Sequence, residues 1–277
     1  MHGPFIGAEA LAAGAVTPYE LRRYCRRLLP GVYVPARTSP GLAERAEAAW
    51  LWSRREGVVS GLAASALHGA KWVGDDTAVE LIWPNHRAPH GVITRNDTVL
   101  DDEIQSVRGL MVTTPERTAF DLARRGPVRD AVARLDALSR VTGLKTADIL
   151  ALAERHWHVR GLRRLPDVLE LVDTGAQSPK ETWLRLLLID AGFPRPQTQI
   201  PVPGPDGYPR YYLDMGWQEV MLAVEYDGEQ HRSDRRQYVT DIRRLDEIAE
   251  RGWRLLRVVA GDREPDIIRR VKRAWPR

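Results

Sequence analysis

Hydrophobic positions along the chain change their spacing several times, and each change predicts a different kind of element. Residues 42–56 have the period of an amphipathic helix, and the small residues of SGLAASALHGA at 60–70 suit a tightly packed helix. AVELIWP at 78–84 and GVITR at 91–95 alternate as strands do, while TTPERTAFDLARRG at 113–126 is typical of a capped helix closed by Gly126. We expect a mixed α/β unit around residues 40–125, followed by mostly helical residues 128–172 with the basic HVRGLRRLP as a break.

The N-terminal segment carries the signals of a capped helix followed by a strand hairpin. Thr17 as N-cap, Pro18 at the first helical position and Glu20 three residues after the cap form a capping box. PGVYV at 30–34 predicts a turn into a strand. We expect the helix to carry four arginines over a broad face: Arg22, Arg23, Arg26 and Arg27.

This order of elements, a helix, a basic helix and a hairpin, is that of a small winged-helix module, whose second helix can enter a DNA groove. The alternative is a solvated arginine-rich helix. Five arginines against one glutamate between residues 17 and 37 favour contact with DNA.

YYLDMGWQEVMLAVEYDGEQH, at 211–231, predicts a hairpin in which three carboxylates interrupt an apolar pattern. If QEVM at 218–221 is the turn, the ladder sets Trp217 opposite Leu222, Met215 opposite Val224, and Asp214 opposite Glu225. Alternation then divides the hairpin into two faces. One face has Leu213, Met215, Trp217, Leu222, Val224 and Tyr226; the other has Asp214, Gly216, Ala223, Glu225 and Asp227.

Two carboxylates directly across an antiparallel pair repel each other unless a cation compensates them. A divalent ion is the economical compensation, and oxygen ligands that leave open positions suit Mg²⁺ or Mn²⁺. The alternative is an acidic face that is simply wet, because Gly216 and Ala223 leave it uncovered. Three acids gathered in AVEYDGEQH argue against that alternative.

Composition and charge narrow the functional classes. At 277 residues with 43% hydrophobic content, the chain can form two globular domains. The formal net charge is only +4, but the arginines cluster, which makes nucleic acid a plausible partner. The single cysteine, Cys25, excludes an internal disulfide and fits a cytoplasmic protein, and no apolar window reaches membrane-spanning length. The pairs His86/His90 and His156/His158 are expected on the surface, since they lack the nearby carboxylate or thiolate support that a metal site needs.

Four ordered motifs resemble the DUF559 domain, which is related to very-short-patch-repair endonucleases within the PD-(D/E)XK nuclease superfamily. They are SPKETWLRLLLIDAGF, LDM, AVEYDGEQH and YVTDIRRLDEIAERGWRLLRV, within about residues 176–260. The resemblance implies a mixed sheet flanked by helices and a metal-dependent DNA endonuclease using Mg²⁺ or Mn²⁺. It implies the catalytic residues Glu181, Asp214, Glu225, Asp227 and His231, with metal ligands Asp214, Glu225 and Asp227, and it puts Asp241 and Arg244 on the next helix, where Arg244 becomes a further candidate DNA contact.

One departure from the superfamily matters, because Asp227 stands where the E-x-K pattern has a lysine. The base that activates water is therefore open among His231, Lys180 and metal-bound hydroxide. His231 is equally suited to orienting Asp227 only.

The first half resembles the N-terminal region of the AbiEi type antitoxin family, through ELRRYCRRLLPGVYV, VVSGLAASALHGA and TTPERTAFDLARRG. That resemblance implies a DNA-binding winged helix. We expect an α/β (α+β overall) protein with a winged-helix-like module at 1–40, an α/β and helical extension at 41–172, and a nuclease-like domain at 176–277. The leading hypothesis is a DNA-targeted endonuclease; the alternative is a non-catalytic, antitoxin-like DNA-binding regulator that uses the nuclease fold as a scaffold.

Overall fold

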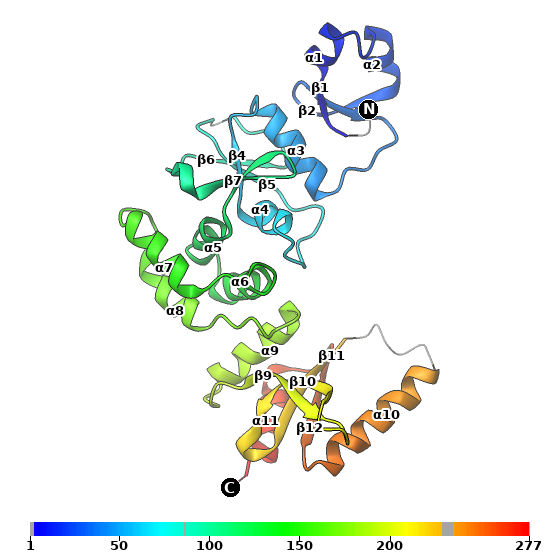
Figure 1. Cartoon of the computed structure of the whole chain (residues 1–277), viewed down its shortest axis with the longest axis vertical. Coiled ribbons are helices and arrows are strands. Elements are labelled where there is room, and N and C mark those ends of the chain that lie inside the picture. Colours follow the sequence, from blue (N-terminus) through cyan, green and yellow to red (C-terminus); the bar gives the residue numbers. More distant parts are fainter. Residues whose placement is uncertain (1–2, 86, 229–234, 277) are drawn as a thin grey trace. The chain divides into compact units, whose positions relative to one another are not determined.

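The computed structural model describes residues 3–85, 87–228 and 235–276, with the backbone alone for residues 235–240. The chain divides into two units, residues 1–170 and 171–277, each with its own internal contacts. Helices and three separate sheets give it the expected α+β class (Figure 1). Among the described helices, none combines the length and apolar character needed to cross a membrane.

The start of the first unit is a three-stranded sheet with two short helices. The sheet order is β1-β3-β2, with all pairings antiparallel. This arrangement of two helices followed by a hairpin is that of a winged helix. The elements are β1 Phe5–Ile6, α1 Gly7–Ala12, α2 Pro18–Tyr24, β2 Cys25–Leu29 and β3 Val32–Pro35.

The predicted helix start is confirmed and its predicted length is wrong. Thr17 caps α2, with Pro18 in the first turn and a reciprocal capping box to Glu20. The helix ends at Tyr24, so Arg26 and Arg27 lie in β2 and not in the helix. They are paired there with Val34 and Tyr33 of β3. Ladder bonds to β3 and burial of the strand's last leucine outweigh the helix propensity of an arginine-rich segment.

The middle of the first unit is a mixed five-stranded sheet in the order β6-β5-β4-β8-β7. Helix α4 is built from the predicted small-residue run, and its alanines Ala63 and Ala64 are fully buried in the same core as Ala46 and Ala49 of α3. The predicted strands at 78–84 and 91–95 are confirmed as β5 and β6. The elements are α3 Leu42–Trp52, β4 Val58–Ser60, α4 Gly61–Leu67, β5 Val79–Ile82, β6 Val92–Arg95, η1 Asp101–Glu103, β7 Ile104–Val107 and β8 Leu110–Thr113.

The first unit closes with the expected helices, the first of which is capped by Thr114 with Pro115 in its first turn. They are α5 Pro115–Ala123, α6 Val128–Thr142, α7 Thr146–Arg155, η2 Leu162–Arg164 and α8 Leu165–Glu170. Helix α5 lies against α4, α6, α7 and α8. Charged side chains of α5 and its C-cap are linked by ion pairs to Glu103 of η1, which bonds His156 directly after α7. We call these residues the buried ion network: Glu103, Arg117, Asp121, Arg124 and His156.

Each carboxylate of the buried ion network has a cationic or imidazole partner. Arg117 pairs with Glu103 and, at 3.1 Å, with Asp121. Arg124 donates to Asp121 and His156 to Glu103, the latter at 2.7 Å. Because a buried charge is tolerated only when it is paired, this network holds α5 to the loop before β7 and to the end of α7.

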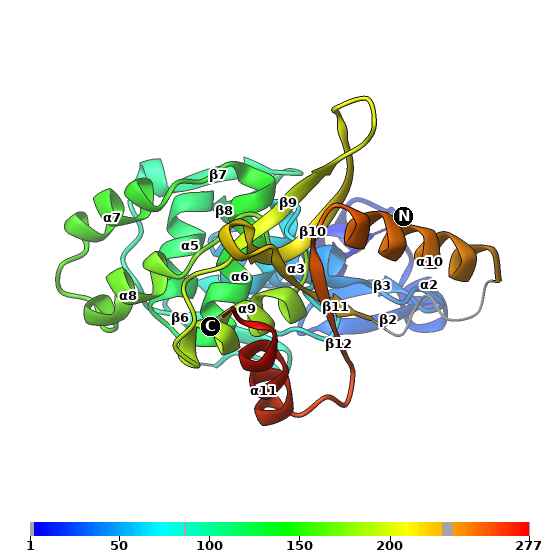
Figure 2. The same ribbon diagram turned by 90° about the horizontal axis from the view of Figure 1, so that it is seen from below.

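The second unit is a mixed four-stranded sheet between helices, in the order β12-β11-β10-β9. The β11–β12 pair is parallel and the other pairs are antiparallel. Helices α9 and α11 cover one face, and α10 covers the other. The elements are α9 Pro179–Asp190, β9 Gln197–Pro203, β10 Pro209–Trp217, η3 Gln218–Val220, β11 Leu222–Asp227, α10 Arg235–Glu250, β12 Arg254–Val259 and α11 Glu264–Ala274. Figure 2 shows β9 and β10 continuing as a two-stranded ribbon beyond the rest of this sheet.

Two of the three predicted hairpin pairs are confirmed: Met215 pairs with Val224 and Trp217 with Leu222 around a turn at 218–221. The third is not, because the β10–β11 pairing ends at Met215 and leaves Asp214 and Glu225 outside that ladder. Gly216 permits the pairing, because a Cβ there would lie 2.4 Å from the Leu222 carbonyl oxygen. The alternative of a simply wet acidic face, left uncovered by Gly216 and Ala223, does not hold. Ala223 is fully buried in a cluster that includes Ile248 of α10, since a strand inside a mixed sheet is covered by helices on both sides.

The place predicted for Leu213 is also wrong. It packs in the cluster with Ala223 and Ile200, whereas Met215 packs in the opposite one. The β10–β11 pairing ends at Met215, so the alternation counted from the turn does not extend to Leu213.

Candidate functional site

The arginines of the winged-helix segment lie on an exposed surface. Helix α2 has no buried residue, and Arg22 and Arg23 occupy its last turn. Arg26 and Arg27 are exposed on the adjoining strand. Among the described residues, Arg22, Arg23 and Arg27 form no ion pair, whereas Arg26 donates a 2.9 Å hydrogen bond to the Thr38 carbonyl across the hairpin.

The single acid of this segment does not neutralise the arginines. The Glu20 carboxylate accepts hydrogen bonds from the Thr17 backbone N–H and hydroxyl, both at 2.8 Å. These bonds hold the pKa of Glu20 below its ordinary value. Residues 17–37 therefore carry a net charge of +4, equal to the formal net charge of the whole chain. Positive charge is concentrated in this one short segment.

Two aromatic residues that the sequence reasoning missed lie beside these arginines. Tyr19 and Tyr24 are 62% and 59% exposed, and their rings meet edge to face with centroids 6.4 Å apart. Exposed tyrosines offer hydroxyl groups and flat faces to a polar partner. The sequence did not indicate them, because the helix that carries them is shorter than predicted, at seven residues, and buries none of its side chains. We call this set the N-terminal basic surface: Tyr19, Arg22, Arg23, Tyr24, Arg26 and Arg27.

In the second unit, three predicted site residues form an acidic cluster: Glu181, Asp214 and Glu225. They come from the first turn of α9, from β10 and from β11. Asp214 accepts a 3.0 Å hydrogen bond from the Tyr226 backbone N–H, which fixes its side chain against β11. Burial, together with the charges of Glu181 and Glu225, raises the pKa of Asp214 to about 7. The three acids are thus electrostatically coupled.

Arginines compensate the neighbouring acids. Arg244 of α10 pairs with both oxygens of Glu225, donating to Oε2 at 3.0 Å. These bonds hold the pKa of Arg244 above its ordinary value although burial opposes them. Asp227 pairs with Arg257 at 2.8 Å. The compensation that we expected from a divalent ion is therefore supplied in part by two guanidinium groups, and Arg244 faces Glu225 rather than open solvent.

The remaining predicted residues have separate places. Glu181 is 8% exposed and accepts hydrogen bonds from the Gln177 N–H and the Ser178 hydroxyl, so it completes the cap of α9. The Lys180 ammonium lies over the rings of Trp183 and Tyr226, at 5.7 and 5.9 Å from their centroids. His231 lies outside the described residues.

The fit of this cluster to Mg²⁺ or Mn²⁺ is partial. The carboxylate oxygens of Asp214 lie close to other acids, and such oxygen ligands suit a hard cation. The bidentate Arg244 occupies the Glu225 oxygens that such an ion would need. Within the described part of the chain, no group of three or more His, Cys, Asp or Glu side chains is arranged to hold a metal ion.

The expectation of surface histidines is wrong for His156. It is 2% exposed, bonded to Glu103 and packed on the Phe120 ring. The carboxylate that supports it lies 53 residues earlier in the chain, so sequence proximity did not indicate it. His158 and His90 are exposed as expected, and His86 lies outside the described residues.

Comparison with known proteins bears on the first unit most directly. Residues 57–171 match the family model of the AbiEi antitoxin C-terminal domain. Two uncharacterized proteins of Mycobacterium tuberculosis, one from strain CDC 1551 and one from strain H37Rv, are each 29% identical over 242 residues, or 86% of this chain and 88% of the relative. No solved structure matches the chain significantly.

Proposed function

We propose that this protein is a DNA-binding regulator of the antitoxin type. The N-terminal basic surface carries the proposal, because it places four exposed arginines on the helix and strand of a winged-helix arrangement. The match of residues 57–171 to an antitoxin domain supports the same class and adds a toxin as the second partner. In this proposal α2 enters the major groove and the β2–β3 hairpin contacts phosphates.

Binding to the DNA upstream of its own coding sequence tests this proposal. Replacing Arg22, Arg23 and Arg27 by glutamine should weaken binding at least tenfold. It should also lower the slope of log affinity against log salt by about 3, since each phosphate contact contributes about 0.9. A matched control replaces three exposed arginines of the second unit, Arg251, Arg254 and Arg273, and should change affinity less than twofold. Equal losses of DNA affinity in the two variants would show that the protein attracts DNA by its overall positive charge and not through a defined interface.

The acidic cluster supports a second candidate function, a metal-dependent DNA endonuclease with Mg²⁺ or Mn²⁺ at Asp214, Glu225 and Asp227. The observation that favours it is Asp214, whose pKa is raised to about 7, because strongly perturbed carboxyl groups gather at functional sites. The regulator is the stronger proposal, since arginines already occupy Glu225 and Asp227.

Two measurements separate the two functions. Titration calorimetry with Mn²⁺ should show binding that Asp214→Asn abolishes if the cluster holds a metal. Supercoiled plasmid incubated with Mg²⁺ or Mn²⁺ should then be nicked by the wild type and not by that variant. DNA binding that survives Asp214→Asn and Glu225→Gln, with no cleavage under either metal, supports the regulator alone.

A further inference from the structure

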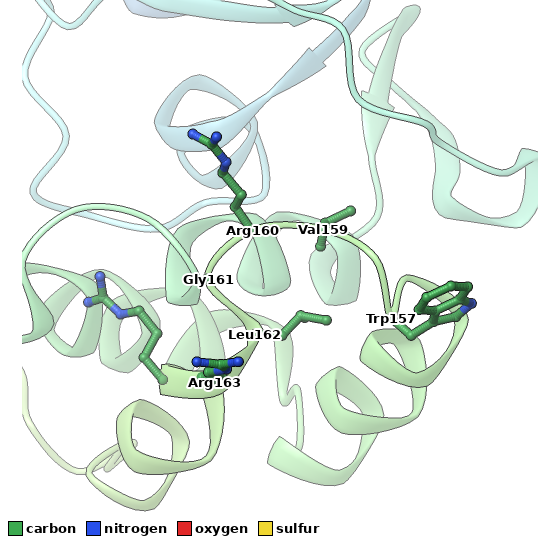
Figure 3. A pocket seen from close by; sticks show the side chains of 7 residues that line it. Trp157, Val159, Arg160, Gly161, Leu162 and Arg163 are labelled. Atoms are coloured by element: carbon green, nitrogen blue, oxygen red, sulfur yellow. The ribbon is translucent and has the colours of Figure 1, made fainter.

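The loop between α7 and α8 forms a cavity of about 490 Å³ that neither proposed function uses (Figure 3). Its lining comes from residues 157–164: one tryptophan, two aliphatic residues, a glycine and three arginines. A cavity of this size accommodates a nucleotide-sized ligand. It lies in the first unit, on a segment distinct from the N-terminal basic surface.

The loop is held in place at both ends. Before it, His156 is buried against Glu103 and Phe120; after it, Leu165 is 1% exposed in the helical core. At its centre, Gly161 has φ +91°, and a Cβ there would lie 2.2 Å from the Arg124 carbonyl oxygen. Only glycine fits this position, so the side chains around it are presented from a fixed backbone.

Arg160, Arg163 and Arg164 give the cavity a positive charge, and in the described part of the chain no carboxylate forms an ion pair with them. Arg164 donates to the Gly126 carbonyl, but its Nε and Nη2 atoms are buried without a hydrogen-bond partner. The exposed guanidinium of Arg163 is free to receive an anion, and phosphate matches the forked geometry of a guanidinium.

Trp157 adds a second kind of contact. It is 79% exposed, and its only ring contact among the described residues is edge to face with His158, at 5.6 Å between centroids. Figure 3 shows the Trp157 ring and the Arg163 side chain on either side of Leu162. An exposed indole is a stacking platform for a base.

We propose that residues 157–164 bind a nucleotide unit, with its base stacked on Trp157 and its phosphate bonded to Arg163. The unit comes either from a free nucleotide or from a single-stranded nucleic acid. Both sources offer the same base and phosphate, and they differ only in whether the chain continues beyond the cavity.

The test uses the full-length protein with three probes: a fluorescent single-stranded pentanucleotide, AMP and inorganic phosphate. The pentanucleotide should bind, and Trp157→Ala and Arg163→Gln should each weaken binding at least tenfold. Trp157→Phe should keep binding within threefold, because a ring remains to stack. Arg87→Gln, which removes an exposed arginine elsewhere in the first unit, should change it less than twofold.

The comparison of probes assigns the source. AMP binding as tightly as the pentanucleotide indicates a free nucleotide, whereas tighter pentanucleotide binding indicates a strand. Pentanucleotide binding that is unchanged in Trp157→Ala, or that requires Arg22, Arg23 and Arg27, would overturn the proposal. Binding of inorganic phosphate without binding of AMP or the pentanucleotide would also overturn it. Failure of upstream duplex DNA to bind would leave this site unaffected, because the two tests rely on different residues.

Discussion

The buried ion network of the first unit and the acidic cluster of the second both contain carboxylates shielded from solvent, but the pKa shifts of these carboxylates have opposite directions. In the network, hydrogen bonds from His156 and Arg117 hold the pKa of Glu103 below its ordinary value although burial opposes them. In the cluster, burial and two neighbouring acids raise the pKa of Asp214 to about 7. Each carboxylate of the network has a partner, and the paired charges hold α5 in place in the first unit. Strongly perturbed carboxyl groups such as Asp214 gather at functional sites, which makes the cluster a candidate site.

Removing the central cation of the network should have the largest effect. Arg117→Ala leaves Glu103 and Asp121 as buried, partly unpaired charges, so the free energy of unfolding should fall by about 3–5 kcal/mol. Urea denaturation followed by circular dichroism measures this change. A loss below about 1 kcal/mol would mean that water or neighbouring groups compensate the acids, and the network would not be the support of α5.

Removing the charge of Asp214 should act in the opposite direction. Its folded-state pKa of about 7 exceeds the ordinary value of 3.8, so its contribution to stability is present below pH 4 and is lost as pH rises through 7. Each pKa unit corresponds to about 1.4 kcal/mol, so Asp214→Asn should be more stable than the wild type by about 2–4 kcal/mol at pH 8. At pH 4 the two should be nearly equal.

Urea midpoints measured between pH 4 and 8 test the sign as well as the size of this effect. Wild-type stability should decline across that range relative to the variant. A difference that does not depend on pH would show that Asp214 is ionised throughout, and the comparison between the two acids would then fail.

Glu103→Gln should show the reverse pH dependence with a smaller amplitude. The variant keeps the shape of the side chain but loses the charge that Arg117 and His156 stabilise, so it should lose about 1–3 kcal/mol at pH 7. Because the pKa of Glu103 is lowered on folding, that stability is present above about pH 4.5 and is lost as pH falls through the folded-state value. The difference between wild type and variant should therefore shrink below pH 4.5, which acid titration of the urea midpoint measures.

Some features of this fold can be predicted from the sequence and others cannot. The cap at Thr17, the small-residue helix α4 and the hairpin pairs nearest the turn follow from local rules, and local rules predicted them. The end of α2 at Tyr24 did not follow, because strand pairing with β3 decides it. The burial of His156 and the bonds from Arg244 to Glu225 arise between residues 53 and 19 positions apart, which no local pattern specifies. Alternation along β11 indicated Glu225 and Asp227, and the family resemblance indicated Glu181; neither indicated the arginine partners of Glu225 and Asp227.

The smallest expected change in the free energy of unfolding comes from an exposed ion pair in the second unit, which serves as a reference for the buried pairs. Arg210 pairs with Glu247 at 3.2 Å, and its side chain is 50% exposed. Solvent screens such a pair, so Arg210→Gln should change the free energy of unfolding by less than about 1 kcal/mol.

Arg244→Gln, the same substitution at the arginine bonded to buried Glu225, should cost more, because it leaves a second uncompensated acid beside Asp214. Salt separates the two: 0.5 M NaCl should remove the small effect of Arg210→Gln and leave most of the effect of Arg244→Gln. Equal effects at high salt would place the Glu225–Arg244 pair with ordinary surface pairs.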